Sequence, residues 1–211
     1  DLWGVWGAAP DDLWAVGGTP REPARTEPVA LRYDGTAWRT VELPPFERDG
    51  VDSLFKVWGP GSDDVYIVGD KGLVLRWDGA AFEELFVGAT DDLISLWGTG
   101  PDEIVAVGGR SNGIVARWDG TEWRSELLPG LPGMNGVWMR EPGVAHIVGL
   151  RGTLATLDLE TLEAAPQPVP ERRDFHAVFG VGGEVLAVGG NLAFPDSPEG
   201  TAYRRTLGND E

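Results

Sequence analysis

The sequence predicts an all-β protein folded as a β-propeller, and three observations lead to that fold class. A module of about 41 residues returns along the chain. Each copy contains four short apolar runs rich in Val, Ile, Leu and Trp, which are strand signals. Gly, Pro and Asp separate these runs, and 31 Gly with 16 Pro among 211 residues disfavour a mainly helical protein.

Three anchors mark each copy and keep the same order. The first is an aromatic residue in runs such as LWGVWG, LFKVWG and LISLWG, at Trp6, Trp58, Trp97, Trp138 and Phe179. The second is a Val-Gly pair, at Val16-Gly17, Val68-Gly69, Val107-Gly108, Val148-Gly149 and Val188-Gly189. The third is Asp-Gly at Asp34-Gly35, Asp78-Gly79 and Asp119-Gly120, with Asp158-Leu159 in the fourth copy. Ordered anchors of this kind indicate internal duplication.

The second copy shows how a blade is built. Its later strands are expected at Val65–Gly69, Leu73–Trp77 and Phe82–Val87. Asp-Gly between the last two predicts a tight hairpin turn with positive φ at both central residues. Runs that are apolar on both faces suit sheets packed between neighbours. Together these features predict a propeller whose blades span residues 1–50, 51–91, 92–132, 133–173 and 174–211.

The last blade is predicted to be incomplete. Its third strand is expected at Thr201–Arg205, because Arg204 matches Arg32, Arg76 and Arg117 of the earlier copies. The sequence then offers no fourth strand. Either the last blade has three strands or the natural polypeptide continues beyond Glu211, and we expect continuation.

The repeats resemble those of bacterial exported propellers of the BNR-like and tectonin-like kind, which read approximately L-x-x-V-W-G, D-D-V-W-A-V-G and G-x-V-L-R-W-D-G-x-x-W. The stretches LWGVWGAAPDDLWAVGG and IVAVGGRSNGIVARWDGTEW carry the resemblance, which runs over nearly the whole chain. It implies a propeller and leaves the activity open, because such repeats serve lectins, assembly factors and scaffolds alike. A sialidase Asp box needs one residue between Asp and Gly. The adjacent pairs here depart from it and weaken the case for sialidase chemistry.

The composition of the chain restricts the classes of partner that we expect it to bind. A net charge of −17 repels phosphate backbones and anionic lipid, so we expect neither nucleic-acid binding nor membrane insertion. The chain has no Cys and shows no catalytic signature, so we expect no cofactor, no metal ion and no enzymatic activity. The resemblance places the protein outside the cell, in the periplasm or on the cell surface.

The loops suggest where a ligand binds. Links between first and second strands, and between third and fourth, form one rim of a propeller and are short here. The other links form the second rim, where stretches 18–28 and 190–199 are long. Unequal loops on a rigid scaffold commonly carry binding. If five blades close a ring, these two loops meet. The predicted ligand-binding residues on this rim are Arg21, Arg25, Phe46, Arg110, Asn112, Asn191, Phe194 and Asp196.

Other repeated residues have structural explanations. We expect the tryptophans, including Trp3 and Trp14, to pack inside and between blades. Arg32, Arg76, Arg117 and Arg204 are expected to pair with neighbouring acids. His146 and His176 are expected to be satisfied within strands. Paired acids at the short turns, such as Asp63-Asp64, allow a cation ring, but Asp also favours turns for its own hydrogen bonds.

Three functions follow from these features. The first is a non-catalytic binding or assembly module using the second rim, with carbohydrate binding as its sharpest form and a glycan or protein as partner. The second is a structural subunit of an extracellular assembly, with self-assembly through the open last blade. The third is a glycoside-active enzyme, which requires two carboxylates near the propeller axis.

Overall fold

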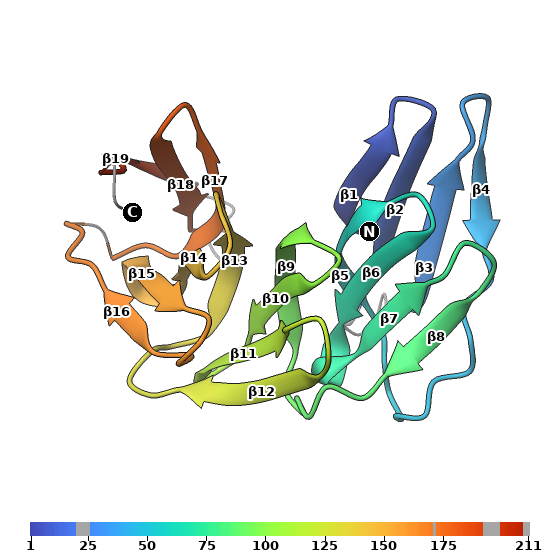
Figure 1. Cartoon of the computed structure of the whole chain (residues 1–211), viewed down its shortest axis with the longest axis horizontal. Helices are drawn as coiled ribbons and strands as arrows, with labels where there is room; N and C mark the ends of the chain where they lie inside the picture. Colours follow the sequence, from blue (N-terminus) through green and yellow to red (C-terminus); the bar gives the residue numbers. More distant parts are fainter. Residues whose placement is uncertain (20–25, 171, 192–198, 209–211) are drawn as a thin grey trace.

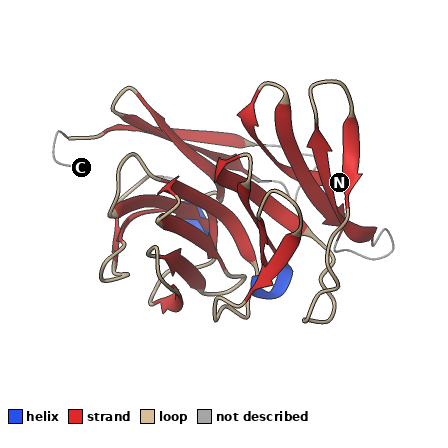
Figure 2. Ribbon diagram, turned by 45° about the vertical axis from the view of Figure 1, so that its right-hand side comes forward, coloured by secondary structure: helices blue, strands red, loops and turns tan. Residues whose placement is uncertain are grey.

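The computed structural model describes residues 1–19, 26–170, 172–191 and 199–208. They form five antiparallel sheets in chain order, and within each sheet every strand pairs with the next along the chain. The sheets stand side by side as the blades of a propeller (Figure 1). Nearly all regular structure is strand, as Figure 2 shows. Among the described residues no helix has the length and apolar character to span a membrane.

The strand bounds follow the repeat. Blade 1 holds β1 (Leu2–Ala9), β2 (Asp12–Thr19), β3 (Thr26–Tyr33) and β4 (Trp38–Val41). Blade 2 holds β5 (Leu54–Gly61), β6 (Asp64–Gly69), β7 (Val74–Trp77) and β8 (Phe82–Leu85), with the short 3₁₀ turn η1 (Asp70–Gly72). Blade 3 holds β9 (Leu93–Gly100), β10 (Glu103–Gly108), β11 (Gly113–Trp118) and β12 (Trp123–Leu128). Blade 4 holds β13 (Met134–Trp138), β14 (Val144–Gly149), β15 (Thr153–Asp158) and β16 (Ala164–Pro166), with η2 (Leu150–Gly152).

Blade 5 holds β17 (Phe175–Val181), β18 (Glu184–Gly190) and β19 (Gly200–Thr206), and its sheet has three strands. The third strand therefore lies where it was predicted, and the predicted fold class is confirmed. Arg204 pairs in register with Leu186 of β18, as Arg32 pairs with Trp14 of β2.

The core lies between the blades. The inner strands β1, β5, β9, β13 and β17 pack in sequence, each against the next. The second strands of the middle blades are buried along almost their whole length, as in β6, β10 and β14. Their side chains alternate toward the two neighbouring blades, and this explains why both faces are apolar.

Tryptophan and glycine fit together at the blade interfaces. A Cβ built on Gly98 would lie 2.4 Å from Cη2 of Trp58, and a Cβ on Gly180 would lie 2.2 Å from Cη2 of Trp138. Each of these indole rings therefore lies against the glycine of the following blade. The predicted packing role of these tryptophans is confirmed, since Trp58 and Trp138 are buried.

The Asp-Gly turns differ from the predicted hairpin. Tyr33 pairs with Trp38, which leaves a four-residue loop where a two-residue turn was expected. Gly35, Gly79 and Gly120 have φ of 87°, 96° and 90°, but the preceding aspartates do not have positive φ. The expectation of two left-handed residues was wrong, because the aspartate instead binds the loop backbone through its side chain.

The expected core position of Trp3 is also wrong. Its side chain is 55% exposed, whereas Trp14 is fully buried. Trp3 lies at a register shift between β1 and β2, where its indole N–H donates to the carbonyl of Gly18 at 2.9 Å. The irregular strand turns this ring out of the blade interface.

The five blades form an open arc. Within the described strands, β17 packs against blade 4 and has no extensive packing with β1. Blades 1 and 5 stand apart at the two ends of the arc (Figure 1). Most of the two long loops lies outside the described residues. Their predicted meeting required a closed five-blade ring, which these sheets do not form.

Candidate functional site

Half of the predicted ligand-binding residues lie in the described structure. Arg21, Arg25, Phe194 and Asp196 lie outside the described residues. Phe46 packs, partly buried, against the core shared by blades 1 and 2. Arg110 and Asn112 share one exposed turn of blade 3, while Asn191 follows β18 in blade 5. These residues lie on the second rim, in links that belong to different blades.

A repeated basic position dominates this rim. The turn between the second and third strands presents Lys71 in blade 2, Arg110 in blade 3 and Arg151 in blade 4, and all three are exposed. Each backbone N–H donates to an aspartate in a link between blades, at the entrance of the following blade for Lys71 and Arg151 and at the entrance of its own blade for Arg110. The acceptors are Asp92 at 2.8 Å, Asp91 at 3.1 Å and Asp174 at 2.8 Å, respectively. We call these three residues the basic ladder.

Two residues of the basic ladder have a strained backbone conformation. Lys71 has φ 56° and Arg151 has φ 58°, in the left-handed region where a side chain is unfavourable. Each residue precedes a glycine in a short 3₁₀ turn, η1 or η2. Such strain persists only where the surrounding contacts maintain it, and it is frequent at functional positions.

The three cations differ in how far they are neutralised. The guanidinium of Arg110 pairs with Asp92. The ammonium of Lys71 donates to the carbonyl oxygen of Asp49 at 2.7 Å. Arg151 has no carboxylate partner for its guanidinium among the described residues, although its backbone is bound to Asp174. It therefore presents an available positive charge on an acidic protein.

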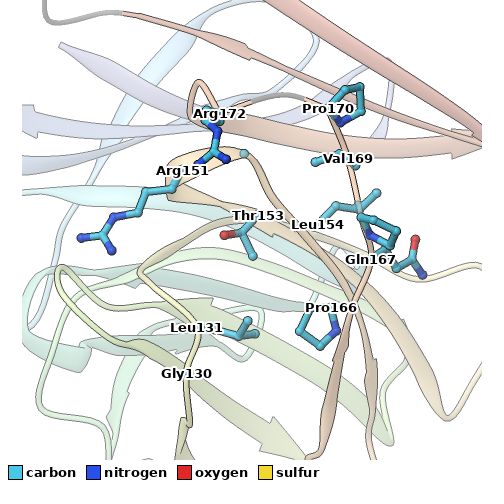
Figure 3. Close-up of a pocket in the computed structure, with 12 residues that line it drawn as sticks. Gly130, Leu131, Arg151, Thr153, Leu154, Pro166, Gln167, Val169, Pro170 and Arg172 are labelled. Atoms are coloured by element: carbon cyan, nitrogen blue, oxygen red, sulfur yellow. The ribbon is translucent and has the colours of Figure 1, made fainter.

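A groove of about 470 Å³ opens beside Arg151 (Figure 3). It runs from the link between blades 3 and 4 to the link between blades 4 and 5. Pro166, Pro168, Pro170, Leu131, Leu154 and Val169 supply its apolar surface, while Thr153, Gln167 and Arg172 add polar groups. An open groove with both polar and apolar lining suits an extended segment that carries an anionic group.

The propeller axis offers little for catalysis. Lys56 occupies the inner-strand position that is Gly4, Ser95, Gly136 and Ala177 in the other blades. Burial lowers the pKa of the Lys56 ammonium. The five inner strands contain no Asp or Glu, so they do not supply the carboxylate pair that a glycoside-active enzyme requires.

Aromatic rings gather beside the axis. Trp97 contacts Phe179 with ring centroids 5.8 Å apart, and Phe179 in turn lies 6.1 Å from Trp138. In blade 4, Met139 stands where the other blades have the glycine that follows the aromatic anchor. Blade 4 therefore has no glycine there to receive Trp97, which packs against the core of blades 3 and 4 and also contacts Phe179 of blade 5.

The repeated arginines have the predicted structural role. Arg32 binds Asp12 through two bonds of 2.7 and 3.0 Å, and Arg76 binds Asp64 at 2.8 Å. Arg117 and Arg204 lie 3.8 and 3.6 Å from Glu103 and Glu184. Blade 4 has Thr156 and Val144 at the two matching positions, so it lacks both partners of the pair.

The paired acids and the histidines also have local partners. The second acid of each pair binds the arginine of its own blade, and the described residues contain no group of three potential metal ligands. His146 is buried and its ring stacks on Trp138. Nε2 of His176 lies 3.0 Å from the carbonyl oxygen of Gly190. The prediction of satisfied histidines is confirmed.

Comparison with solved structures finds the same architecture. The structure of YCF48 bound to D1 peptide matches with a TM-score of 0.61 and 20% identity, over 89% of this chain and 60% of that chain. YCF48 from Cyanidioschyzon merolae matches with a TM-score of 0.62 and 15% identity, over 89% of this chain and 63% of that one. The likeness shows the fold. This chain spans about three fifths of the length of those structures.

No protein-family model matches the chain, and no curated protein matches it. Membership of the BNR-like or tectonin-like group therefore stays a prediction.

Sequence reasoning missed Arg151 and Arg172 as site residues. The repeat itself carried a signal for Arg151. Lys71, Arg110 and Arg151 each fall shortly after a Val-Gly anchor, whereas the arginines before Asp-Gly lie on the third strand. The repeated cations on the strands pair with acids of their own blades, whereas the repeated cations in the loops are exposed on the second rim. Of the loop cations, only Arg110 was predicted to bind a ligand. Arg172 has no counterpart in the repeat that could have marked it.

Proposed function

We propose that this propeller is a non-catalytic binding module that receives an extended protein segment on its second rim. The groove beside Arg151 is the proposed seat, and the segment is expected to carry an acidic side chain or a terminal carboxylate. The observation that carries the proposal is the guanidinium of Arg151, without a carboxylate partner in the described structure, at the edge of a proline-lined groove. Arg–carboxylate pairs are strong and directional, so this group would orient the segment.

Two further observations support the proposal. The basic ladder places cations in successive blades along the same rim, so a segment longer than the groove would next meet Arg110, which is paired with Asp92, and Lys71. One similar structure, YCF48 bound to D1 peptide, is a complex of a propeller with a peptide, and this supports the proposal.

The test begins with peptides selected from a phage-displayed random library on the immobilised 211-residue protein. Selected peptides are then synthesised with a fluorophore and titrated by fluorescence anisotropy. We expect an excess of Asp, Glu or a free C-terminus among them. Replacing the acidic group with its amide should weaken binding at least about tenfold, the loss of one charge-assisted pair.

Protein variants locate the seat. Arg151→Gln and Arg172→Gln should each weaken binding of the selected peptides. Arg140→Gln is the matched control, because Arg140 is an exposed arginine of the same blade on the opposite rim. Equal binding by all three variants and the parent protein would remove the groove as the seat.

Carbohydrate binding by Phe46, Phe194, Arg110 and Asn112 stays a separate prediction, and a glycan array tests it. Deleting 20–27 or 191–198 should abolish any glycan signal if the long loops recognise the sugar. The location outside the cell also stays a prediction.

A further inference from the structure

The two ends of the arc leave apolar blade faces uncovered. Each blade has a face that points to the preceding blade, and equivalent residues on this face differ in burial between blade 1 and the other blades. Val57, Leu96, Val137 and Val178 occupy one such position and are all buried. Their counterpart in blade 1 is Val5, which is 67% exposed. Val5 is therefore apolar like its counterparts, but no blade of the described structure covers it.

Blade 5 shows the same contrast on its opposite face. Val16, Val68, Val107 and Val148 are fully buried against the following blade, whereas Val188 is 40% exposed. Trp14, Tyr66, Val105 and His146 are buried at a neighbouring position where Leu186 is exposed. Val181 adds to this exposed face. A surface that is solvent-facing by design would carry polar residues at these alternating positions.

The aromatic anchor follows the rule as well. Trp58 and Trp138 are covered by the following blade, but Phe179 is 54% exposed. At the other end, Gly7 is exposed while its counterparts Gly59, Gly98 and Gly180 are buried. Gly98 and Gly180 each receive a tryptophan from the preceding blade. In the described structure, Phe179 of blade 5 therefore has no glycine of a following blade to pack against. Gly7 of blade 1 has no aromatic ring of a preceding blade packed on it.

We propose that both faces are blade–blade interfaces, and that their partners are further blades of the same repeat carried by the same polypeptide. The blade next to Phe179 is expected to present a glycine directly after its own aromatic anchor. The blade next to Val5 is expected to place a Trp or Phe against Gly7. These two faces continue the interface that already recurs four times between the five blades.

A second copy of this five-blade chain fits these faces less well. Pairing the blade 5 face of one copy with the blade 1 face of another is a head-to-tail contact, which forms a filament unless its rotation closes a ring. Every copy also carries a net charge of −17, so close association brings together strongly repelling molecules. Similar propellers have longer single chains, of which 60% and 63% are matched here.

The test compares the 211-residue chain with the product of the complete reading frame that contains it. The reading frame should encode further repeats, with anchors spaced by about 41 residues from Phe179 or Trp6. In the complete product, Phe179→Ser should lower Tm by roughly 10 °C, because a ring buried between blades is lost. In the 211-residue chain the same substitution should lower Tm by clearly less, because only the ring contacts with Trp97 and Trp138 are lost there.

Phe86→Ser is the matched control, since Phe86 is 83% exposed and lies outside both faces. It should leave Tm unchanged in both proteins. A reading frame without further repeats would overturn the proposal, and so would equal Tm values for the two variants of the complete product. Light scattering supplies the other contrary outcome: discrete dimers of the 211-residue chain that Phe179→Ser dissociates would identify a second copy as the partner.

Discussion

Two glycines of one inner strand lie in opposite surroundings. A side chain on Gly98 would meet the indole of Trp58 and the carbonyl oxygen of Glu103, whereas a Cβ on Gly100 has no atom within 4 Å. Both residues lie in β9, two positions apart, and neither has a left-handed φ. They therefore compare a closely packed position with an open one in the same strand.

We predict that Gly98→Ala lowers the free energy of unfolding by about 1–3 kcal/mol. The added methyl group overpacks the site and displaces the ring of Trp58, in blade 2, from its place on blade 3. Gly100→Ala should change it by less than about 0.5 kcal/mol. Urea denaturation followed by tryptophan fluorescence measures both. Equal effects would mean that the contact between ring and glycine does not determine blade packing.

Arg151 combines strain with an available charge. Its φ of 58° costs free energy that a glycine would not pay, and its N–H bond to Asp174 needs no side chain. The arginine is therefore retained against a local preference for glycine. Function is a sufficient reason for such a choice, because sites often keep residues that lower stability.

We predict that Arg151→Gly raises the free energy of unfolding by about 0.5–1 kcal/mol while weakening peptide binding. Arg140→Gly should have the opposite sign of effect on stability, since Arg140 is not left-handed and the change only adds backbone entropy to the unfolded chain. Urea denaturation gives both values. Destabilisation by Arg151→Gly would show that the side chain is structural.

At the scale of the element, the Asp-Gly loops use one device in four blades. Oδ1 of Asp34, Asp78, Asp119 and Asp158 accepts the N–H groups two and three residues ahead. In three of the loops a threonine hydroxyl donates as well, from Thr36, Thr121 and Thr161. These bonds to the charged form lower the pKa of Asp34 and of Asp119.

The loops predict a loss of stability in acid. A carboxyl whose folded pKa lies below its ordinary value of 3.8 stabilises the fold above that pH, and the contribution is lost as pH falls. We expect Tm to fall as pH drops below about 4, and to fall less steeply for the variant Asp34→Asn with Asp119→Asn. Asn keeps the accepting oxygen but cannot gain a proton. Differential scanning calorimetry at low ionic strength measures the slope, because salt screens exposed charges.

The control for this slope is Glu126→Gln with Glu141→Gln, which removes the same charge from exposed positions outside these loops. If both double variants show the parent slope, the turn aspartates do not set the acid response.

The sequence predicted elements well where the repeat is regular. Anchors at Trp58 and Val68-Gly69 located the strands of blade 2, and Arg204 located β19 in a blade whose long loop obscures the spacing. It failed where one residue changes the local geometry. Trp3 lies at a strand irregularity that no composition reveals. The loop at Asp34 has its length set by the pairing of Tyr33 with Trp38, which the Asp-Gly pair alone does not specify.

The candidate site was less predictable for a physical reason. Loop length drew attention to blades 1 and 5, whereas the groove beside Arg151 lies in blade 4 and depends on links that meet only in the folded chain. The repeat in the sequence shows which blades are alike. It does not show which side chains of successive links lie together in the folded chain.

At the scale of the whole molecule, the arc is a row of blades that pack mainly against their neighbours. Stability in such an array is a sum of blade terms and interface terms. Blade 3 has an interface on each side, whereas blade 5 has one, against blade 4. Blade 5 is therefore expected to open at a lower free energy than blade 3 in the 211-residue chain.

We predict that amide hydrogens of β18 exchange at least roughly tenfold faster than those of β10, a difference of about 1.4 kcal/mol in opening. The two strands are matched, because each is hydrogen-bonded on both edges within its own sheet. They differ in their contacts with neighbouring blades, and the sheet of β18 has three strands where that of β10 has four. Hydrogen–deuterium exchange read by mass spectrometry resolves the two peptides. Equal protection would mean that the arc unfolds as one cooperative unit, and that one missing interface does not weaken its end.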